Sequence, residues 1–423
     1  MLEKCVMVHN FIRFLSSVLI MIGFLQACSP SNPLTCLDPL GCFVIPVNEP
    51  IRIGYILSLT GVAQSFGRDI LNGVNLAIDD YQGQLWGHPL ELSGEDVDCS
   101  SEEIQKAATN LTLKKDFIGI IGPHCPTPMK AAALTLSNAG IISIPLMAAA
   151  LTLAQDDPAI PPGIYGLTVD PIPQGQMAAN FAYFKLKASR VALVKDDSAY
   201  SDALADSFRV TYQNLGGTII YEGIIEPSAI DMHFMLSILQ NYSPEVLYFP
   251  IFERSADYLV LQKNDFPNLQ GMALISSDEL LVDSFFEHTG KLAEDVYLSG
   301  LDMGNPDYSI FSEKWLAKYK QPPESTYHLI SYDATHLLFA SISNTAEMGS
   351  DGSLLIGRQS LRDAFSQIRD FSGLSGSITC MQSDLCPTNP QLGIFQPNSL
   401  EDFQTNWPLQ PLWESDQIQS DNN

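Results

Sequence analysis

Short apolar runs alternate with helical stretches twice along this chain, and this alternation limits the folds open to it. In the first series, buried strands are expected at residues 51–57, 88–96, 117–121 and 141–145. In the second series, they are expected at residues 191–195, 218–225, 245–250 and 272–276. Strands that alternate with helices form parallel sheets covered by helices. The sequence therefore predicts an α/β protein with two doubly wound parallel-sheet lobes.

The segment 117–140 carries a strand, a tight turn and a helix in succession. The apolar strand ends at Gly122-Pro123, a Pro-rich turn follows at residues 125–128, and a helical run ends at Gly140. Proline is tolerated in the first turn of a helix, and glycine commonly follows the last turn. In a parallel sheet this arrangement places free backbone N–H groups at the carboxyl edge, where ligands bind.

Composition excludes several classes of partner. The chain has 423 residues, of which 46% are apolar and 17% charged, as expected of a folded protein with more than one core. Its formal net charge of −26 would repel the phosphates of a nucleic acid and the headgroups of anionic lipid. We therefore expect no nucleic-acid partner and no basic membrane-binding face.

The first 28 residues read as an export signal. Lys4 and Arg13 precede an apolar run at residues 14–25 that is too short for a stable membrane anchor. The run ends in Leu-Gln-Ala-Cys, which resembles a bacterial lipobox and makes Cys28 the lipidated residue. The alternative is a signal peptide with a coincidental cysteine. We expect an exported protein that is lipid-anchored at the periplasmic or cell-surface face of a bacterial membrane.

Residues 29–50 are rich in Pro, Ser and Asn and are expected to form a tether, and the tail after residue 413 is expected to be disordered. No other apolar run reaches membrane-spanning length. Apart from Cys5 and Cys28, six cysteines remain, and an exported protein can pair them as disulfides. Cys36 with Cys42 and Cys380 with Cys386 would close short loops, although the sequence alone allows fifteen pairings. Metal ligation is the rival interpretation, but no CxxC or clustered Cys/His spacing supports it.

A series of motifs in matching order then resembles one known family. The motifs are GYILSLTGVAQSFGRDILNGVNLAIDD, DVDCSSEE, IGPHCPTPMKAAA, NAGIISIP, YGLTVDPIPQG, VALVKDDSAYSDALADSF, LISSDELLV and ISYDATHLL. Together they resemble the type I periplasmic binding fold, in the branch of leucine/isoleucine/valine-binding proteins of ABC importers. The resemblance covers roughly residues 51–395.

The resemblance implies the division of the chain. Three hinge crossings would place residues 51–168 and 298–374 in lobe one, and residues 169–297 and 375–423 in lobe two, with the ligand between the lobes. It also implies a disulfide between Cys99 and Cys125, which follow the second strand and the third strand.

The resemblance further implies the site. In amino-acid-binding members, hydroxyls and backbone N–H groups of lobe one hold the α-carboxylate. Here Pro126 occupies the first hydroxyl position, with Thr127 one residue later, and Ala148 and Ala149 occupy the second. Proline also removes one N–H donor. We therefore expect a solute that is less anionic at this end: an amide, an amine-bearing compound or another organic solute.

Other positions match the family better. Tyr200 matches the tyrosine that closes over the ligand, and Asp278 matches the acid that meets the ammonium group. Phe66 and Phe252 match aromatic wall residues. The structural alternatives are a helix cap for Asp278, core packing for both phenylalanines and an ordinary first-turn residue for Thr127.

The expected function is delivery of a small amino-acid-like or amide-like solute to an ABC importer by a monomer that needs no cofactor and no metal. Its partners would be the small-molecule ligand and the permease subunits. An enzyme is the first alternative, but the chain has no GxSxG, HExxH or Walker A motif. A ligand-sensing component of a signalling system is the second, and the sequence leaves it open.

Overall fold

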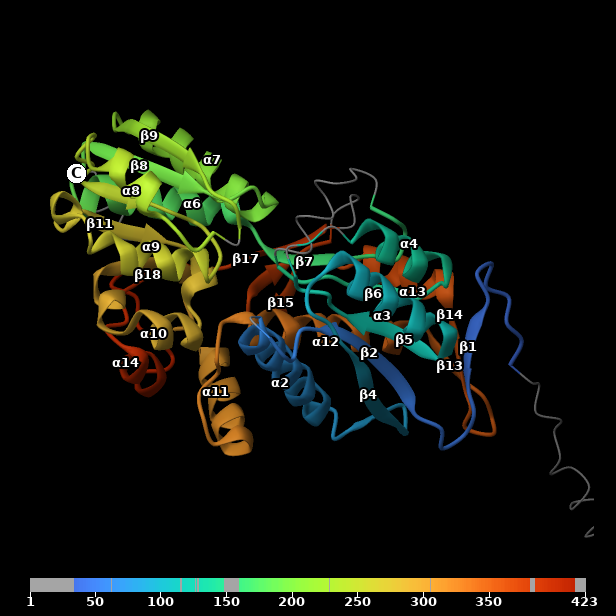
Figure 1. Ribbon diagram of the computed structural model, residues 1–423. Coiled ribbons are helices and arrows are strands. Elements are labelled where there is room, and N and C mark those ends of the chain that lie inside the picture. Colours follow the sequence, from blue (N-terminus) through green and yellow to red (C-terminus); the bar gives the residue numbers. More distant parts are fainter. Residues whose placement is uncertain are drawn as a thin grey trace, which may run out of the picture.

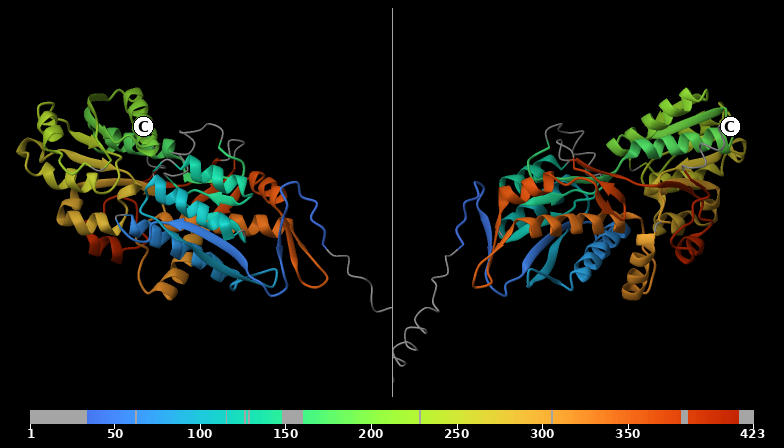
Figure 2. Two further views of the ribbon diagram at one scale, coloured as in Figure 1. Left: turned by 45° about the vertical axis from the view of Figure 1, so that its right-hand side comes forward. Right: turned by 180° about the vertical axis from the view of Figure 1, so that it is seen from behind.

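The computed structural model describes residues 34–414, apart from residues 62, 115, 126, 128, 148–159, 228, 305 and 381–384. Two large sheets, each covered by its own helices, form two separate parts of the molecule (Figures 1 and 2). The predictions for Cys28, Ala148 and Ala149, for the export signal and for the tail after residue 414 lie outside the described residues.

The first sheet has five strands in the order β3-β4-β2-β5-β6. These strands are β2 (Ile51–Leu57), β3 (Gln84–Leu85), β4 (His88–Asp96), β5 (Phe117–Ile121) and β6 (Ile142–Ile144). All pair in parallel except the short β3. The accompanying helices are α2 (Gln64–Asp80), α3 (Ser101–Lys114) and α4 (Lys130–Asn138). Every residue of β5 is buried, which is why this strand reads as a continuous apolar run.

The second sheet has seven strands in the order β19-β18-β12-β11-β10-β8-β9. They are β8 (Arg190–Lys195), β9 (Thr218–Ile224), β10 (Val246–Tyr248), β11 (Ala273–Ser276), β12 (Val296–Leu301), β18 (Leu392–Phe395) and β19 (Trp413–Glu414). The strands from β9 to β12 are parallel, and β18 and β19 are antiparallel. The accompanying helices are α6 (Pro171–Asn180), α7 (Ala199–Asn214), α8 (His233–Leu239), α9 (Ser255–Lys263) and α10 (Asp283–Thr289).

The chain passes between the two sheets three times, as predicted. The first and third passages run through β7 (Gly166–Val169) and β17 (Leu385–Asn389), which pair in parallel between the sheets (Figure 1). The second runs from β12 through α11 (Pro306–Tyr319) to α12 (Tyr327–Thr345), which packs on α2. Since β12 pairs with β11, residues 298–301 lie in the second sheet, beyond the first residue predicted for lobe one.

Further elements lie between the two large sheets and at the ends of the molecule. They are β15 (Phe371–Gly373) and β16 (Gly376–Ile378), which extend the sheet of β17 and β7, α13 (Arg358–Ser366), and α14 (Leu400–Thr405). A small sheet of β1 (Cys42–Ile45), β14 (Leu354–Gly357) and β13 (Ala346–Met348) lies at the end of the molecule away from the second sheet (Figure 1). Near it, the Asp38 carboxylate accepts hydrogen bonds from the backbone N–H groups of Gln359 at 3.0 Å and Ser360 at 2.9 Å, at the start of α13.

The three predicted disulfides are confirmed. Cys36 pairs with Cys42, Cys99 with Cys125 and Cys380 with Cys386. The second joins the loop after β4 to the loop after β5, and therefore ties two neighbouring loops at the carboxyl edge of the first sheet.

Candidate ligand-binding site

The carboxyl edges of the two parallel sheets face each other through a set of buried side chains. In each sheet the first strand, β2 or β8, lies between its second and third strands, which is the topology that opens a crevice at the switch point. Seven side chains fill the space between the two sheet edges, and all of them come from segments just after a strand or from the start of a helix. We call them the junction: Phe66, His124, Tyr200, Phe252, Asp278, Glu279 and Tyr327, of which Phe252 is half-buried and the others are buried.

On the side of the second sheet, Tyr200 and Asp278 are in direct contact. Tyr200 is the second residue of α7, whose start is capped by Ser198, and Asp278 follows β11 by two residues. The Tyr200 hydroxyl donates to Asp278 Oδ1 at 2.5 Å, and Gln174 Nε2 donates to the same oxygen at 2.6 Å. Gln174 also reaches the backbone oxygen of Ser299 at 3.0 Å, so α6, α7, β11 and β12 converge on one carboxylate.

Burial sets the protonation of this pair. Burial, followed by the charges of Asp278 and Glu279, raises the pKa of Tyr200 well above its usual value, so its phenol keeps its proton and donates it. Burial also raises the pKa of the Asp278 carboxyl, while the hydrogen bonds from Gln174 and Tyr200 act in the opposite direction.

Glu279 and Tyr327 connect the two sides of the junction. Tyr327 is the first residue of α12, which packs on α2 of the first sheet, and Glu279 belongs to the loop after β11. The Tyr327 hydroxyl lies 3.2 Å from both carboxylate oxygens of Glu279. Burial, followed by the charge of Asp278, raises the pKa of Glu279 well above its usual value. Its surroundings therefore favour the protonated form of Glu279, and Tyr327 is its hydrogen-bonding partner across the junction.

Aromatic rings border the polar groups. The ring centroids of Phe66 and Tyr327 lie 4.8 Å apart, and those of Tyr200 and Phe252 lie 6.4 Å apart. The His124 ring meets Tyr327 edge-on at 6.4 Å, and burial lowers the pKa of His124 to about 4, with the backbone of Ala63 acting in the opposite direction. His124 is therefore neutral at physiological pH and adds no positive charge to the junction.

A close backbone approach places Phe66. Gly67, in the first turn of α2, lies so near the loop after β2 that a Cβ there would stand 1.8 Å from the backbone oxygen of Ser58. Only glycine fits this position. The start of α2 can therefore pack against the strand end, with the Phe66 ring turned toward Tyr327.

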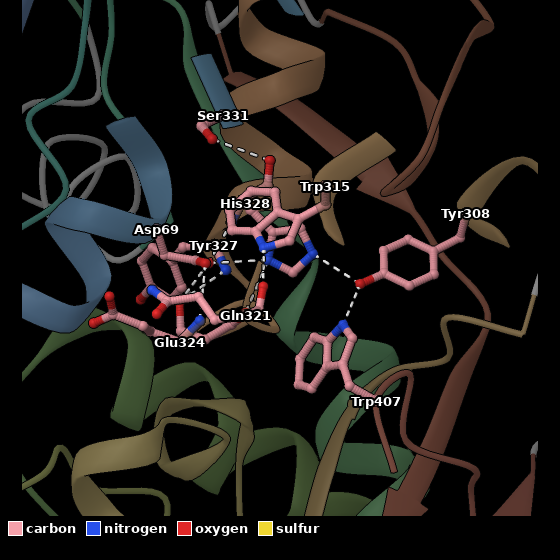
Figure 3. A network of polar contacts seen from close by, with 10 residues as sticks. Asp69, Tyr308, Trp315, Gln321, Glu324, Tyr327, His328, Ser331 and Trp407 are labelled. Carbon is pink, nitrogen blue, oxygen red and sulfur yellow. Dashed lines mark hydrogen bonds and ion pairs between the residues drawn. The ribbon is translucent and has the colours of Figure 1, made fainter. Parts of the chain in front are cut away.

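A buried polar network holds the start of α12, and with it Tyr327 (Figure 3). Asp69 Oδ2 accepts hydrogen bonds from His328 N–H at 2.7 Å, His328 Nδ1 at 3.0 Å and Ser325 Oγ at 2.8 Å. Because Nδ1 faces acceptors, it carries a proton, and Nε2 lies 3.0 Å from the Tyr308 hydroxyl on the other side of the ring. Trp407 Nε1 donates to the same hydroxyl at 2.6 Å, so the network joins α2, α12, α11 and the segment after α14.

The outcome for the predicted lobe-one residues is mixed. The α4 helix begins at Lys130, after the Pro-rich turn predicted at residues 125–128. A residue that precedes proline avoids the helical region, and Thr127 precedes Pro128. Thr127 therefore precedes this helix, and the alternative of an ordinary first-turn residue is wrong. The half-buried Thr127 directs its hydroxyl to the backbone oxygen of Cys99 at 2.7 Å, across the loops that the Cys99–Cys125 disulfide ties.

The structure brings the predicted Tyr200, Asp278, Phe252 and Phe66 together at the junction. Asp278 does not cap a helix: its carboxylate is buried and bonded to Gln174 and Tyr200.

Three residues of the junction, Glu279, Tyr327 and His124, were not predicted, nor was the supporting Gln174. Glu279 and His124 each follow a buried strand within three residues, and that position was the available signal for both.

Two groups of described side chains bring three metal-ligating atoms within 4.8 Å of one another. In the first, Cys99 and Cys125 are joined in the disulfide beside His124, so their sulfur atoms are not available as thiolates. In the second, His288 Nδ1 lies 3.2 Å from Glu253 Oε1 and 3.0 Å from Asp257 Oδ2, and these contacts between the three side chains account for the cluster. No described helix has the length and hydropathy required to cross a membrane.

Two parallel sheets that meet at their carboxyl edges around buried polar groups define a two-lobed binding protein. A model of the periplasmic binding protein family matches residues 50–390, and the chain belongs to this family. The family prediction made from the motifs is thereby confirmed.

The relatives extend this result. The chain is 25% identical over 249 residues to the "Amino acid binding protein" of Pseudomonas aeruginosa, covering 57% of this chain and 63% of that one, so the match spans less than two thirds of the relative. It is 24% identical over 302 residues to the "Leu/Ile/Val-binding protein BraC3" of Rhizobium johnstonii, covering 69% of this chain and 78% of that one.

Solved structures share the fold. LivJ of Streptococcus pneumoniae, a branched-chain amino acid transporter substrate-binding protein in complex with isoleucine, superposes with a TM-score of 0.69 at 21% identity, covering 83% of this chain and 97% of that one. A solute-binding protein of an ABC transporter from R. palustris, in complex with benzoate, superposes with a TM-score of 0.67 at 16% identity, covering 86% and 96%. The type I periplasmic binding fold is thus confirmed.

Proposed function

We propose that the chain is an extracytoplasmic solute-binding protein that holds a small amino-acid-like or amide-like solute at the junction and delivers it to the permease of an ABC importer. The observation that carries the proposal is the pair of buried contacts at the facing sheet edges, Tyr200 with Asp278 and Tyr327 with Glu279. Buried polar groups at the carboxyl edges of parallel sheets are the usual place for ligands in such folds. The names of the relatives support the same class of function.

In this proposal the lobes follow the predicted division, with all of β12 joined to lobe two. Tyr200, Asp278, Phe252 and Phe66 contact the ligand, together with Thr127, Ala148 and Ala149 from lobe one. Because Tyr327 and Glu279 touch across the lobes, entry of a ligand requires this contact to open. Opening and closing is then a hinge motion on the three passages between the sheets.

Titration calorimetry tests the binding function directly. The purified chain is titrated with leucine, isoleucine, valine and their amides, and the expected result is weak or absent binding of the free amino acids, since the first hydroxyl position is Pro126. Sub-micromolar binding of a branched-chain amino acid would contradict the expected solute but support the class. A Tyr200→Phe variant should lose affinity for any solute that binds, since Tyr200 supplies a hydroxyl at the junction.

Lipid anchoring at Cys28 belongs to the proposal as well. Cells that express the full chain are labelled with palmitate, and the label is expected on the wild type and absent from Cys28→Ser. Label retained on Cys28→Ser would refute lipidation at this residue. Uptake of the bound solute is then compared in a strain that lacks this gene and in a strain that lacks the permease. Uptake that is lost without the permease but kept without this gene would refute the delivery role.

A further inference from the structure

Four buried oxygen atoms close to the junction lack a hydrogen-bond partner among the described residues. They are Tyr248 Oη, Ser277 Oγ, Asp278 Oδ2 and Thr326 Oγ1. Ser277 and Thr326 are adjacent in sequence to Asp278 and Tyr327, and Tyr248 is close enough for the charge of Asp278 to raise its pKa, although burial is the larger cause. Buried polar atoms of native proteins are almost always bonded, so unpartnered oxygen atoms on junction residues and their neighbours point to a polar ligand.

The charge of the same region has one sign. Asp196, Asp278 and Glu279 are all buried at the carboxyl edge of the second sheet. No described Lys, Arg or His forms an ion pair with any of the three. Asp196 is bonded instead to Ser198 N–H at 2.9 Å and lies 3.5 Å from the N–H of Phe252. Three buried carboxyl groups without a cation favour a positively charged partner over a neutral or negative one.

Among the described junction residues on the side of the first sheet, which are Phe66, His124 and Tyr327, none carries a positive charge, and the neutral His124 ring has one N–H donor. The Thr127 hydroxyl donates to a backbone oxygen, and the neutral His124 ring makes no hydrogen bond of normal geometry within the described chain. A carboxylate at the junction would be buried close to Asp278 and Glu279, which are acidic groups of the same sign, and this costs several kcal/mol.

We propose that the junction binds an organic cation without a carboxylate group, with its positive charge between Asp278 and Glu279. The proposal rests on the proposed function, since it uses the same site between the lobes. Asp278 Oδ2 has no hydrogen-bond partner among the described residues, so it can accept a hydrogen bond from the ligand without losing another. Glu279 accepts from the ligand in its ionised form, while Tyr327 continues to donate to it.

Binding of the cation is coupled to loss of a proton. The groups that face Glu279 are Asp278, Asp196, Tyr327 and Tyr200, and none of them is a cation. Glu279 therefore holds its proton in the ligand-free chain, because burial and the charge of Asp278 raise its pKa. When the cation arrives, the Glu279 O–H bond breaks and the proton passes to solvent. Affinity for the cation consequently decreases as the pH falls below the pKa of Glu279 in the free protein.

The test uses four probes with one branched carbon skeleton: isopentylamine, isocaproamide, isocaproate and L-leucine. Titration calorimetry of the full chain is carried out in two buffers with different ionisation enthalpies, which reports the number of protons released. Isopentylamine is expected to bind at least about tenfold tighter than the other three and to release about one proton at a pH below the pKa of Glu279.

Variants separate the roles of the carboxyl groups. Glu279→Gln should weaken isopentylamine binding by about tenfold to a hundredfold, the range of one charge-assisted hydrogen bond, and should abolish the proton release. The matched control is Glu222→Gln, which removes one carboxylate from the exposed face of β9 and should leave both quantities unchanged. Proton release in the wild type provides a readout that does not depend on how well Glu279→Gln folds.

Each result decides between the two proposals. Tighter binding of L-leucine, isocaproate or isocaproamide overturns the cation inference and leaves the proposed solute-binding function intact. Binding of isopentylamine without proton release, and without a loss in Glu279→Gln, also overturns the inference. Absence of binding by all four probes counts against the cation inference and the proposed function together.

Discussion

The Asp69→Asn substitution tests the network that positions Tyr327. In the wild type one buried carboxylate accepts from His328 N–H, His328 Nδ1 and Ser325 Oγ through Oδ2, and from Glu324 N–H at 3.2 Å through Oδ1. An asparagine keeps the shape but carries no charge. Its amide oxygen can replace only one carboxylate oxygen, and its NH₂ group then faces a donor at the other position.

The expected loss follows from this bonding. Removing the charge of a buried, fully bonded carboxylate typically costs about 3 to 5 kcal/mol of unfolding free energy. Asp79→Asn on the same helix is the matched control, because Asp79 is exposed and pairs with Lys318 at the surface at 2.6 Å. Exposed pairs contribute about 1 kcal/mol or less. Both variants make the same Asp→Asn change, so the difference between their losses of unfolding free energy reports the effect of burial.

The assay is urea denaturation at neutral pH, followed by tryptophan fluorescence, since Trp315 and Trp407 belong to the same buried group of rings. Asp69→Asn should lower the unfolding midpoint clearly, and Asp79→Asn should shift it little, with similar slopes. A loss of less than about 1 kcal/mol for Asp69→Asn would refute the view that this network holds the start of α12.

Three further predictions follow from separate features. Replacing Cys99 and Cys125 by serine should lower the free energy of unfolding by about 3.5 kcal/mol, the value expected for a disulfide that closes a loop of 26 residues. An unchanged free energy of unfolding in urea denaturation would contradict this prediction. Burial raises the pKa of Glu253 from 4.5 to about 7, so the folded state holds a proton that the unfolded state releases between these values. The free energy of unfolding should therefore decrease by about 3 kcal/mol as the pH rises through this window, and Glu253→Gln should flatten the decrease. An unchanged pH profile in that variant would exclude this residue as the cause. Gly67→Ala should cost about 3 kcal/mol or more, because its Cβ would meet Ser58 at 1.8 Å, and a variant with wild-type stability would show that α2 can shift.

Much of the fold could be predicted from the sequence because the decisive signals are local. Buried parallel strands read as continuous apolar runs, and the predicted strand at residues 51–57 matches β2 residue for residue. The short-range disulfides follow from spacing of six residues. Proline and glycine also mark boundaries locally: α4 begins at Lys130, after the Pro-rich turn predicted at residues 125–128.

The site was only partly predictable because its contacts are distant in sequence. Tyr200 and Asp278 could be placed at strand ends, but their hydrogen bond spans 78 residues. Glu279 was invisible beside Asp278, since its role depends on Tyr327, which lies 48 residues further on and belongs to the other side of the junction. Alternating periodicity reveals which face of an element is buried but not which buried polar groups meet.

The small sheet at the end of the molecule has a mechanical consequence. The described chain passes through Asp38 and β1, which are bonded to the start of α13 and along β14. A pulling force applied to the N-terminal side would thus be carried by these bonds into the first sheet, and would not cross the junction. If the chain is anchored at its N-terminal side and the lobes move as proposed, attachment would act on the end of the molecule that carries the small sheet, away from the second sheet (Figure 1).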